Sequence, residues 1–362
     1  MKLGALGTGI FYGCFAALYA QQAPASWNEK SAAAYLDQRI AWWMDWPSAA
    51  RDHETFCVSC HTAVPYAVAR PSLRTGAAAQ TPSALERRLV DNVTRRVRMW
   101  KEVEPFYPTK KEADPKTVES RGTESILNAL ILVRYAETDG KLSPEARKAL
   151  DNMLAEQIET GDARGAWPWL QFHNSPWEGD SQYYGATLAA IAIGTAPEYD
   201  RSASGIRNGL KMLSEYLVRE QASQITLHRV MLLWASAKLP GLLSSAQQKS
   251  IADEAFSKQQ ADGGFSLSSL VGGWKRKDNT PLETRSDGYA TGLILFVLQQ
   301  VGMSRTQPQI QRGMEWLTSN QQAAGNWLGW SLNKQRDPAS DAGHFMGDAA
   351  TAYAVLALTN AK

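Results

Sequence analysis

Two kinds of hydrophobic pattern alternate along the chain. One kind is apolar on nearly every helical face, in the stretches that begin at Gly122, Gly179, Ser286 and Gly347. A helix that is apolar all round is a buried helix, so these stretches predict helices in the interior. A fifth and less regular copy begins at Gln224.

The four regular stretches each open with a side chain that is typical of helix N-caps. These residues are Thr123, Asp180, Asp287 and Asp348. Side-chain oxygens of Thr and Asp accept hydrogen bonds from the first backbone N–H groups of a helix. We therefore expect these residues to be caps, without a chemical role.

The second kind of pattern is amphipathic and charged, and it predicts outer helices. It covers residues 31–46, 83–99, 143–159, 202–220, 244–260 and 307–321. The first inner helix is expected at 57–69, kinked or shortened by Pro65. Six outer and six inner helices predict an all-α fold, an (α/α)6 toroid over residues 26–362 as one domain. All inner helices of such a ring begin at the same mouth.

A short repeat carries a family resemblance. The segment 321–327 reads Q-Q-A-A-G-N-W, segment 259–265 reads Q-Q-A-D-G-G-F, and segment 165–167 keeps only G-A-W. From about residue 120 onward the chain resembles the squalene–hopene cyclase and prenyltransferase family through its Q-x-x-x-G-x-W repeat. The resemblance implies an α/α toroid in which the Gln caps an outer helix and the aromatic packs at the next inner helix.

The residues that carry that family's chemistry are absent from the sequence. Class II cyclases use a D-x-D-D acid, and the chain contains no such motif. Protein prenyltransferases hold zinc with Asp, Cys and His, but no cysteine follows Cys60. We expect neither activity, since a fold does not by itself imply a function.

The amino terminus has the pattern of an export signal. One Lys precedes a short apolar run, and small residues follow near Ala20 and Ala25. Residues 1–25 are therefore expected to be a signal peptide that directs the chain to the periplasm. The mature chain then keeps two of its three cysteines, Cys57 and Cys60.

These two cysteines belong to the strongest chemical signal in the sequence, the CxxCH motif at residues 57–61. Cys57, Cys60 and His61 have the spacing of c-type haem attachment, in which two thiols bind the porphyrin and the His binds iron. This predicts one haem c. Four alternatives remain open: zinc bound by His53 with the three motif residues, a redox-active disulfide, a structural disulfide, and a chance occurrence of the motif.

The distal iron ligand is expected from a loop that precedes another inner helix. The last such loop, 341–348, carries Met346, our first choice, and His344, our second. An earlier loop carries His173. We interpret His228 as a hydrogen-bonded core histidine, because it falls within a predicted helix.

Four arginines near predicted helix ends are candidates to face haem propionates. They are Arg70, Arg74, Arg121 and Arg285, and solvated surface positions are the alternative for each. The net charge is +2 with no basic block, which argues against nucleic-acid binding. The mixed charge of the outer helices is typical of a monomer.

The sequence predicts an exported mono-haem c-type cytochrome that exchanges electrons with an unidentified redox protein or carries out haem-dependent oxidation. One alternative is a toroid without haem that binds an apolar, isoprenoid-like molecule in its centre. The other is a cyclase-like or prenyltransferase-like enzyme that lacks the D-x-D-D acid. Thirteen tryptophans, many beside Gly or Pro, are candidates to wall a cavity.

Overall fold

The structure, a computed structural model, describes residues 26–74, 81–107, 115–171 and 182–360. Within these residues the fold is all-α, as predicted, and the only strands are the two-residue pair β1 (Ala50–Arg51) and β2 (Thr55–Phe56). No described helix combines the length and apolar character needed to cross a membrane. The predicted signal peptide, 1–25, lies outside the described residues.

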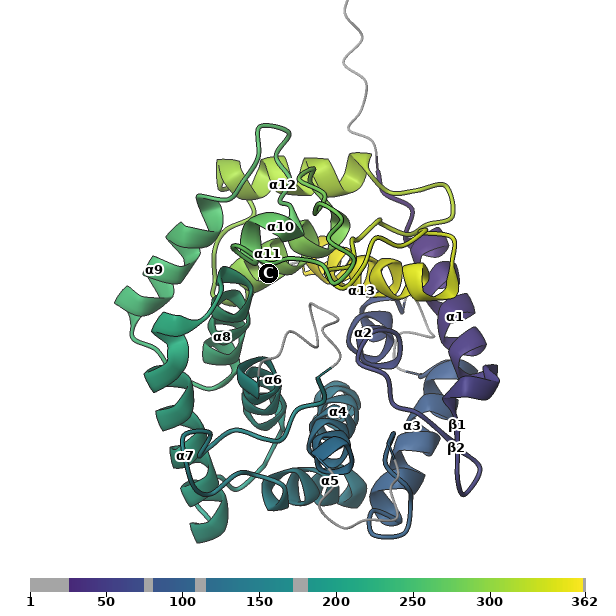
Figure 1. The fold of residues 1–362 in the computed structure, drawn as a ribbon, viewed down its shortest axis with the longest axis vertical. Helices are drawn as coiled ribbons and strands as arrows, with labels where there is room; N and C mark the ends of the chain where they lie inside the picture. Colours follow the sequence, from purple (N-terminus) through teal and green to yellow (C-terminus); the bar gives the residue numbers. More distant parts are fainter. Residues whose placement is uncertain (1–25, 75–80, 108–114, 172–181, 361–362) are drawn as a thin grey trace, which may run out of the picture.

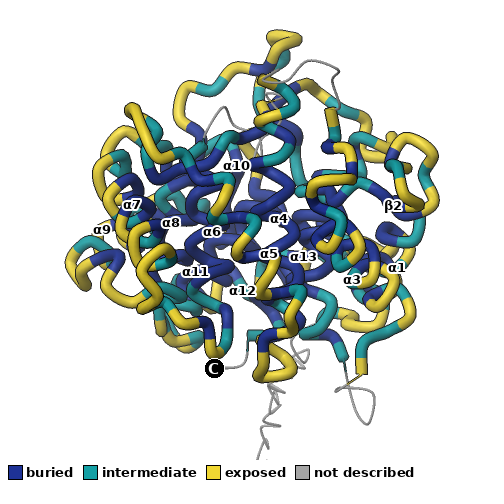
Figure 2. The backbone as a smooth tube through the Cα atoms, turned by 90° about the horizontal axis from the view of Figure 1, so that it is seen from below, coloured by how far each residue is buried: buried dark blue, intermediate teal, exposed yellow. Residues whose placement is uncertain are grey.

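An inner set of helices forms the centre of the molecule (Figure 1). Among the described residues these helices are α2 (Ala63–Ala69), α4 (Pro115–Asp139), α6 (Gln182–Thr195), α8 (Thr226–Lys238), α11 (Gly288–Gln300) and α13 (Asp341–Thr359). They are buried over most of their length, and Figure 2 shows this as the dark blue centre of the molecule. The pattern that is apolar all round therefore marks the interior, as expected.

An outer set of helices surrounds them and keeps an exposed face toward solvent. In the described residues it consists of α1 (Glu29–Asp45), α3 (Ala84–Arg98), α5 (Pro144–Ala155), α7 (Ser204–Glu220), α9 (Ser245–Phe256) and α12 (Pro308–Ser319). A short helix, α10 (Leu267–Leu270), precedes α11. Outer and inner helices alternate along the chain, and the first inner helix, α2, packs against the last, α13.

The predicted N-caps of the inner helices are only partly correct. Asp287 caps α11 by accepting the N–H of Ala290, as expected. The prediction that Thr123 and Asp348 are N-caps was wrong, because α4 and α13 begin earlier and contain these residues. Ser340 caps α13 instead. Asp180 lies outside the described residues.

The Gln of the repeat joins the outer helix that it follows to the next outer helix. Gln321, after α12, accepts the N–H of Asn28 at 2.7 Å and donates to the Asn28 carbonyl at 3.0 Å. Asn28 is the N-cap of α1, so these bonds connect the last outer helix to the first. Gln259 likewise donates to the carbonyl of Gln309, just inside α12.

A third copy of this Gln was missed in the sequence. Gln157 donates to the carbonyls of Gly165 and Gly209, so it joins the end of α5 to α7. Its distance from Gly165 is eight residues instead of four, which hides the repeat. The buried indoles of Trp167 and Trp327 donate to carbonyls of the preceding outer helices.

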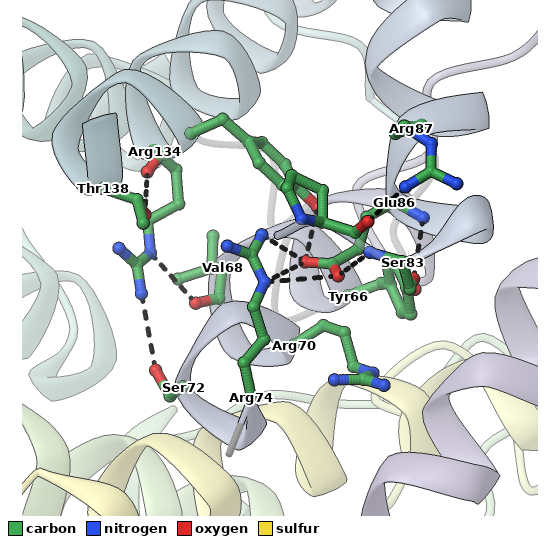
Figure 3. A network of polar contacts seen from close by, with 12 residues as sticks. Tyr66, Val68, Arg70, Ser72, Arg74, Ser83, Glu86, Arg87, Arg134 and Thr138 are labelled. Carbon is green, nitrogen blue, oxygen red and sulfur yellow. Dashed lines mark hydrogen bonds and ion pairs between the residues drawn. The ribbon is translucent and has the colours of Figure 1, made fainter. Parts of the chain in front are cut away.

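A buried ion pair fixes the segment that follows α2 (Figure 3). Arg74, directly after the 3-10 turn η2 (Arg70–Leu73), donates to the carboxylate of Glu86 in α3 at 2.6 Å. Glu86 also completes a capping box with Ser83 at the start of α3. The end of the first inner helix is therefore tied to the neighbouring outer helix.

The variant Gln321→Ala tests the connection between α12 and α1. Loss of the Gln321 amide leaves backbone groups of Asn28 and Gly325 without their hydrogen-bond partner. We therefore expect the unfolding free energy to fall by about 1–3 kcal/mol. Urea denaturation measures this. The control is Gln322→Ala, which removes only a local bond to Asn320 and should change stability by about 0.5 kcal/mol or less. Equal losses in both variants would contradict the proposed role.

Candidate functional site

A cavity of about 350 Å³ lies where inner helices begin. Its wall brings together Cys57, Cys60, His61 and Met346, and we call it the motif cavity. The first part of α4 and the start of α13 complete the wall. Its volume is in the range of small-molecule and cofactor sites, about 300–1,000 Å³.

The CxxCH motif lies in a turn before α2, which corrects the expectation that Cys57 opens the helix. Cys57 follows β2; its N–H donates to the carbonyl of Ala49, and its carbonyl accepts from the indole of Trp43, both at 2.8 Å. The hydroxyl of Ser59 accepts the N–H groups of Thr62 and Ala63. These bonds stabilise the turn that carries the motif, and α2 begins only after it, with Thr62 at the N-cap position.

The two motif cysteines are not joined in a disulfide, and both are partly buried. Burial raises the pKa of Cys57 to about 12, and Arg51 opposes this only in part. A redox-active C-x-x-C pair has a lowered thiol pKa and a βαβ setting. Cys57 has a raised pKa instead, and the described residues around the motif form no βαβ unit, so the redox-disulfide alternative gains no support.

The imidazole of His61 is held on two sides by aromatic rings. It stacks on Phe345 with ring centroids 3.7 Å apart and meets the edge of Trp43 at 4.8 Å. Its Nδ1 lies 2.9 Å from the hydroxyl of Thr62. Burial, with a smaller effect of Arg39, lowers the pKa of His61 to about 3, so the ring is neutral near pH 7. Neutral imidazole is the form that binds metals.

Thr62 connects His61 to a buried carboxylate in α13. The Thr62 hydroxyl donates to Oδ2 of Asp348 at 2.7 Å. Arg39 donates to the same carboxylate through Nε at 2.8 Å and Nη2 at 3.2 Å, and the hydroxyl of Tyr35 donates at 3.1 Å. Burial raises the pKa of Asp348, while Arg39 and the hydrogen bonds from Thr62 and Tyr35 oppose that rise.

The structure distinguishes between the two candidates for a distal ligand. Met346 is 3% exposed and lines the motif cavity. His344 is partly buried in the first turn of α13 and is not among the described residues of the cavity wall. His173 lies outside the described residues. The placement therefore favours Met346 over His344.

The zinc set is not assembled. His53 is exposed in a turn beside Asp52, at 3.5 Å from its carboxylate, and does not line the motif cavity. Among the described residues, no three His, Cys, Asp or Glu side chains lie close enough to hold a metal ion. A haem iron does not need such a group, since the porphyrin supplies four of its ligands.

The four arginines expected near haem have other partners. Arg70 pairs with Asp37 and Arg74 with Glu86, while Arg121 donates to backbone carbonyls and Arg285 stacks on a tryptophan. None of them is among the described residues that line the motif cavity.

Three other arginines line the cavity: Arg51, Arg96 and Arg336. Sequence reasoning missed them, because no spacing relates them to the motif. Arg51 stacks on Phe106, and its buried Nε has no hydrogen-bond partner.

Arg96 and Glu124 form a buried ion pair at the cavity wall. The guanidinium donates to both carboxylate oxygens, at 2.6 and 3.0 Å, and also to Thr55 and the carbonyl of Glu104. The pair joins α3, α4 and the strand that precedes Cys57. It therefore fixes the wall from which the motif begins.

His228 is a core histidine, as expected, but only one of its ring nitrogens has a partner. It is 4% exposed, and Nδ1 lies 3.1 Å from the side-chain oxygen of Gln224. Its Nε2 is buried without a hydrogen bond, and burial lowers the pKa of the ring to about 4. His228 does not line the motif cavity.

Comparison with known proteins identifies the fold alone. No protein-family model matches the chain, and no curated protein matches it. A solved wild-type glycosidase superposes with a TM-score of 0.51 at 14% identity, covering 91% of this chain and 96% of that chain. Variants of a glycosidase give TM-scores of 0.51 and 0.50 at 13% identity, covering 91% and 92% of this chain and 96% of theirs.

The variant Glu124→Gln tests the ion pair at the cavity wall. It leaves a buried guanidinium without its counter-charge, so we expect unfolding free energy to fall by about 3 kcal/mol. Urea denaturation is the measurement. Glu54→Gln is the matched control, since Glu54 meets another arginine of α3, Arg95, at the exposed surface, where a pair contributes about 1 kcal/mol or less. A loss of similar size in the control would contradict the interpretation.

Proposed function

We propose that this chain is an exported, mono-haem c-type cytochrome built on an (α/α)6 toroid and active in electron transfer. One observation carries the proposal: two thiols, an imidazole and a thioether, from Cys57, Cys60, His61 and Met346, line the same cavity. Since Met346 lies 286 residues from Cys60, sequence proximity does not explain this grouping.

The residues present suit a covalently held haem. Cys57 and Cys60 supply two thiols for the two vinyl groups, and His61 supplies the proximal nitrogen. Its Nδ1 is engaged by Thr62, which assigns iron binding to Nε2. When bound, haem supplies an iron that cycles between the ferrous and ferric states.

Met346 is proposed to occupy the distal position. A thioether ligand raises the reduction potential and suits an electron carrier. Trp43, Trp46 and Phe345 line the same cavity, and their rings would exclude water from the iron's surroundings. The proposed activity is therefore electron exchange with a redox protein at the cavity opening, and no separate substrate is required.

Arg51 and Arg336 are the candidates to bind the two propionates. Both are partly exposed in the cavity wall, and Arg51 has a guanidinium nitrogen without an acceptor. The start of α13 lies at the same wall, and helix N-termini favour negative charge. An arginine fork matches the geometry of a carboxylate.

The likeness to glycosidases supports a toroid and not glycoside hydrolysis. That reaction uses two carboxyl groups flanking the bond that is cleaved. Glu124 is the single carboxylate among the described residues of the cavity wall, and it is paired with Arg96. The apolar wall is also compatible with the second candidate, a toroid that binds an isoprenoid-like molecule without haem. The resemblance to the cyclase family stays a prediction.

Expression of the full chain in a host that matures c-type cytochromes tests the proposal directly. We expect the mass of the exported protein to exceed that of the mature polypeptide by one haem, and the band to keep haem staining after denaturation. The variant with Cys57→Ala and Cys60→Ala should lose both signals. Ser59→Ala is the control, because it alters the motif without removing a thiol and should keep the haem.

An unmodified mass for the wild-type protein from that host would overturn the proposal. It would favour the binding module without haem, which extraction of the purified protein for apolar small molecules then tests.

The variant Met346→Leu tests the distal ligand. Leu keeps the apolar volume but cannot bind iron, so the ferrous protein should bind carbon monoxide at least about tenfold faster than wild type, which corresponds to about 1.4 kcal/mol in the barrier. Stopped-flow absorption measures the rate. His344→Leu should bind carbon monoxide at the wild-type rate. Faster binding in His344→Leu, together with a wild-type rate in Met346→Leu, would assign the distal position to His344.

A further inference from the structure

Asp348 is a buried acid that helix capping does not explain. It lies inside α13 and is 1% exposed. Each of its carboxylate oxygens accepts two hydrogen bonds: Oδ1 from Arg39 and Tyr35, and Oδ2 from Arg39 and Thr62. An ionised carboxylate has the acceptor capacity for four such bonds, and the contact with Arg39 supplies the counter-charge.

The direction of these hydrogen bonds fixes the tautomer of His61. The hydroxyl of Thr62 has one proton, which it donates to Asp348. The Thr62 oxygen can therefore only accept at its 2.9 Å contact with Nδ1 of His61. It follows that Nδ1 carries the proton, and that Nε2 is the unprotonated nitrogen that can bind a metal.

We propose that Asp348, acting through Thr62, holds His61 in this tautomer and increases the electron donation of its imidazole, which lowers the reduction potential of the iron. The inference rests on the proposed function, because it concerns the haem carried by the same site. Asp348 and Thr62 are positioning residues, since neither touches the iron.

The physical reason is that hydrogen-bond chains polarise their members. A carboxylate at the far end of the chain draws the Nδ1 proton toward Thr62, which makes the imidazole a stronger donor through Nε2. Stronger donation stabilises ferric over ferrous iron. Thr62 is 2% exposed and Arg39 is 7% exposed, so water does not screen this chain. Met346 would raise the potential from the other side, and the two ligands therefore act in opposite directions.

Redox titration of the haem-bearing wild type and three variants tests the inference. Thr62→Val keeps the shape of the side chain but breaks the connection, so its midpoint potential should shift to a more positive value. Thr62→Ser restores the hydroxyl and should return the potential to that of wild type. Tyr35→Phe removes a different hydrogen bond from Asp348, outside the chain to His61, and should leave the potential near that of wild type.

Two results would overturn the inference. One is an unchanged midpoint potential in haem-bearing Thr62→Val. The other is an equal shift in Tyr35→Phe, which would indicate general loosening of the site. If Thr62→Val does not fold, Thr62→Ala replaces it in the same comparison. A wild-type protein without haem would instead refute the proposed function, so the two failures are distinguishable.

Discussion

The candidate site depends on the hydrogen bonds that the carboxylate of Asp348 accepts, because they connect α13 to parts of the chain hundreds of residues earlier. Arg39 and Tyr35 reach it from the first outer helix, and Thr62 reaches it from the turn that carries the motif. Since Asp348 belongs to α13, these bonds hold the last inner helix against the first. Met346, two residues earlier in α13, thereby comes to line the same cavity as His61.

Buried charge gives this region its definite geometry. Around the motif, the described residues contain two buried arginine–carboxylate pairs: Arg39–Asp348 and Arg96–Glu124. Such pairs add little net stability, because desolvation offsets their attraction. Their bidentate geometry instead penalises other arrangements of the same helices. Side chains that would hold a cofactor need positions fixed to this precision.

The candidate chemistry lies in the turn before α2 and in the first turns of α13, at one end of the helical frame. Solved structures that resemble this fold include glycosidases at 13–14% identity, yet the described wall of the motif cavity offers one paired carboxylate beside two thiols and an imidazole. One helical frame hosts unrelated functions when the segments at its mouth differ. The start of an inner helix is favourable for such a site, because its unpaired N–H groups attract anions.

The sequence by itself determined the all-α class, the alternation of buried and amphipathic helices, and the three residues of the CxxCH motif, because these depend on local periodicity and spacing. It did not determine that α4 and α13 begin before Thr123 and Asp348, nor that Arg51, Arg96 and Arg336 line the cavity. Only the tertiary structure decided that Met346 rather than His344 lines the cavity, and that Asp348 contacts Thr62. These facts depend on which faces of distant helices meet, and helix packing fixes that through contacts between residues hundreds of positions apart.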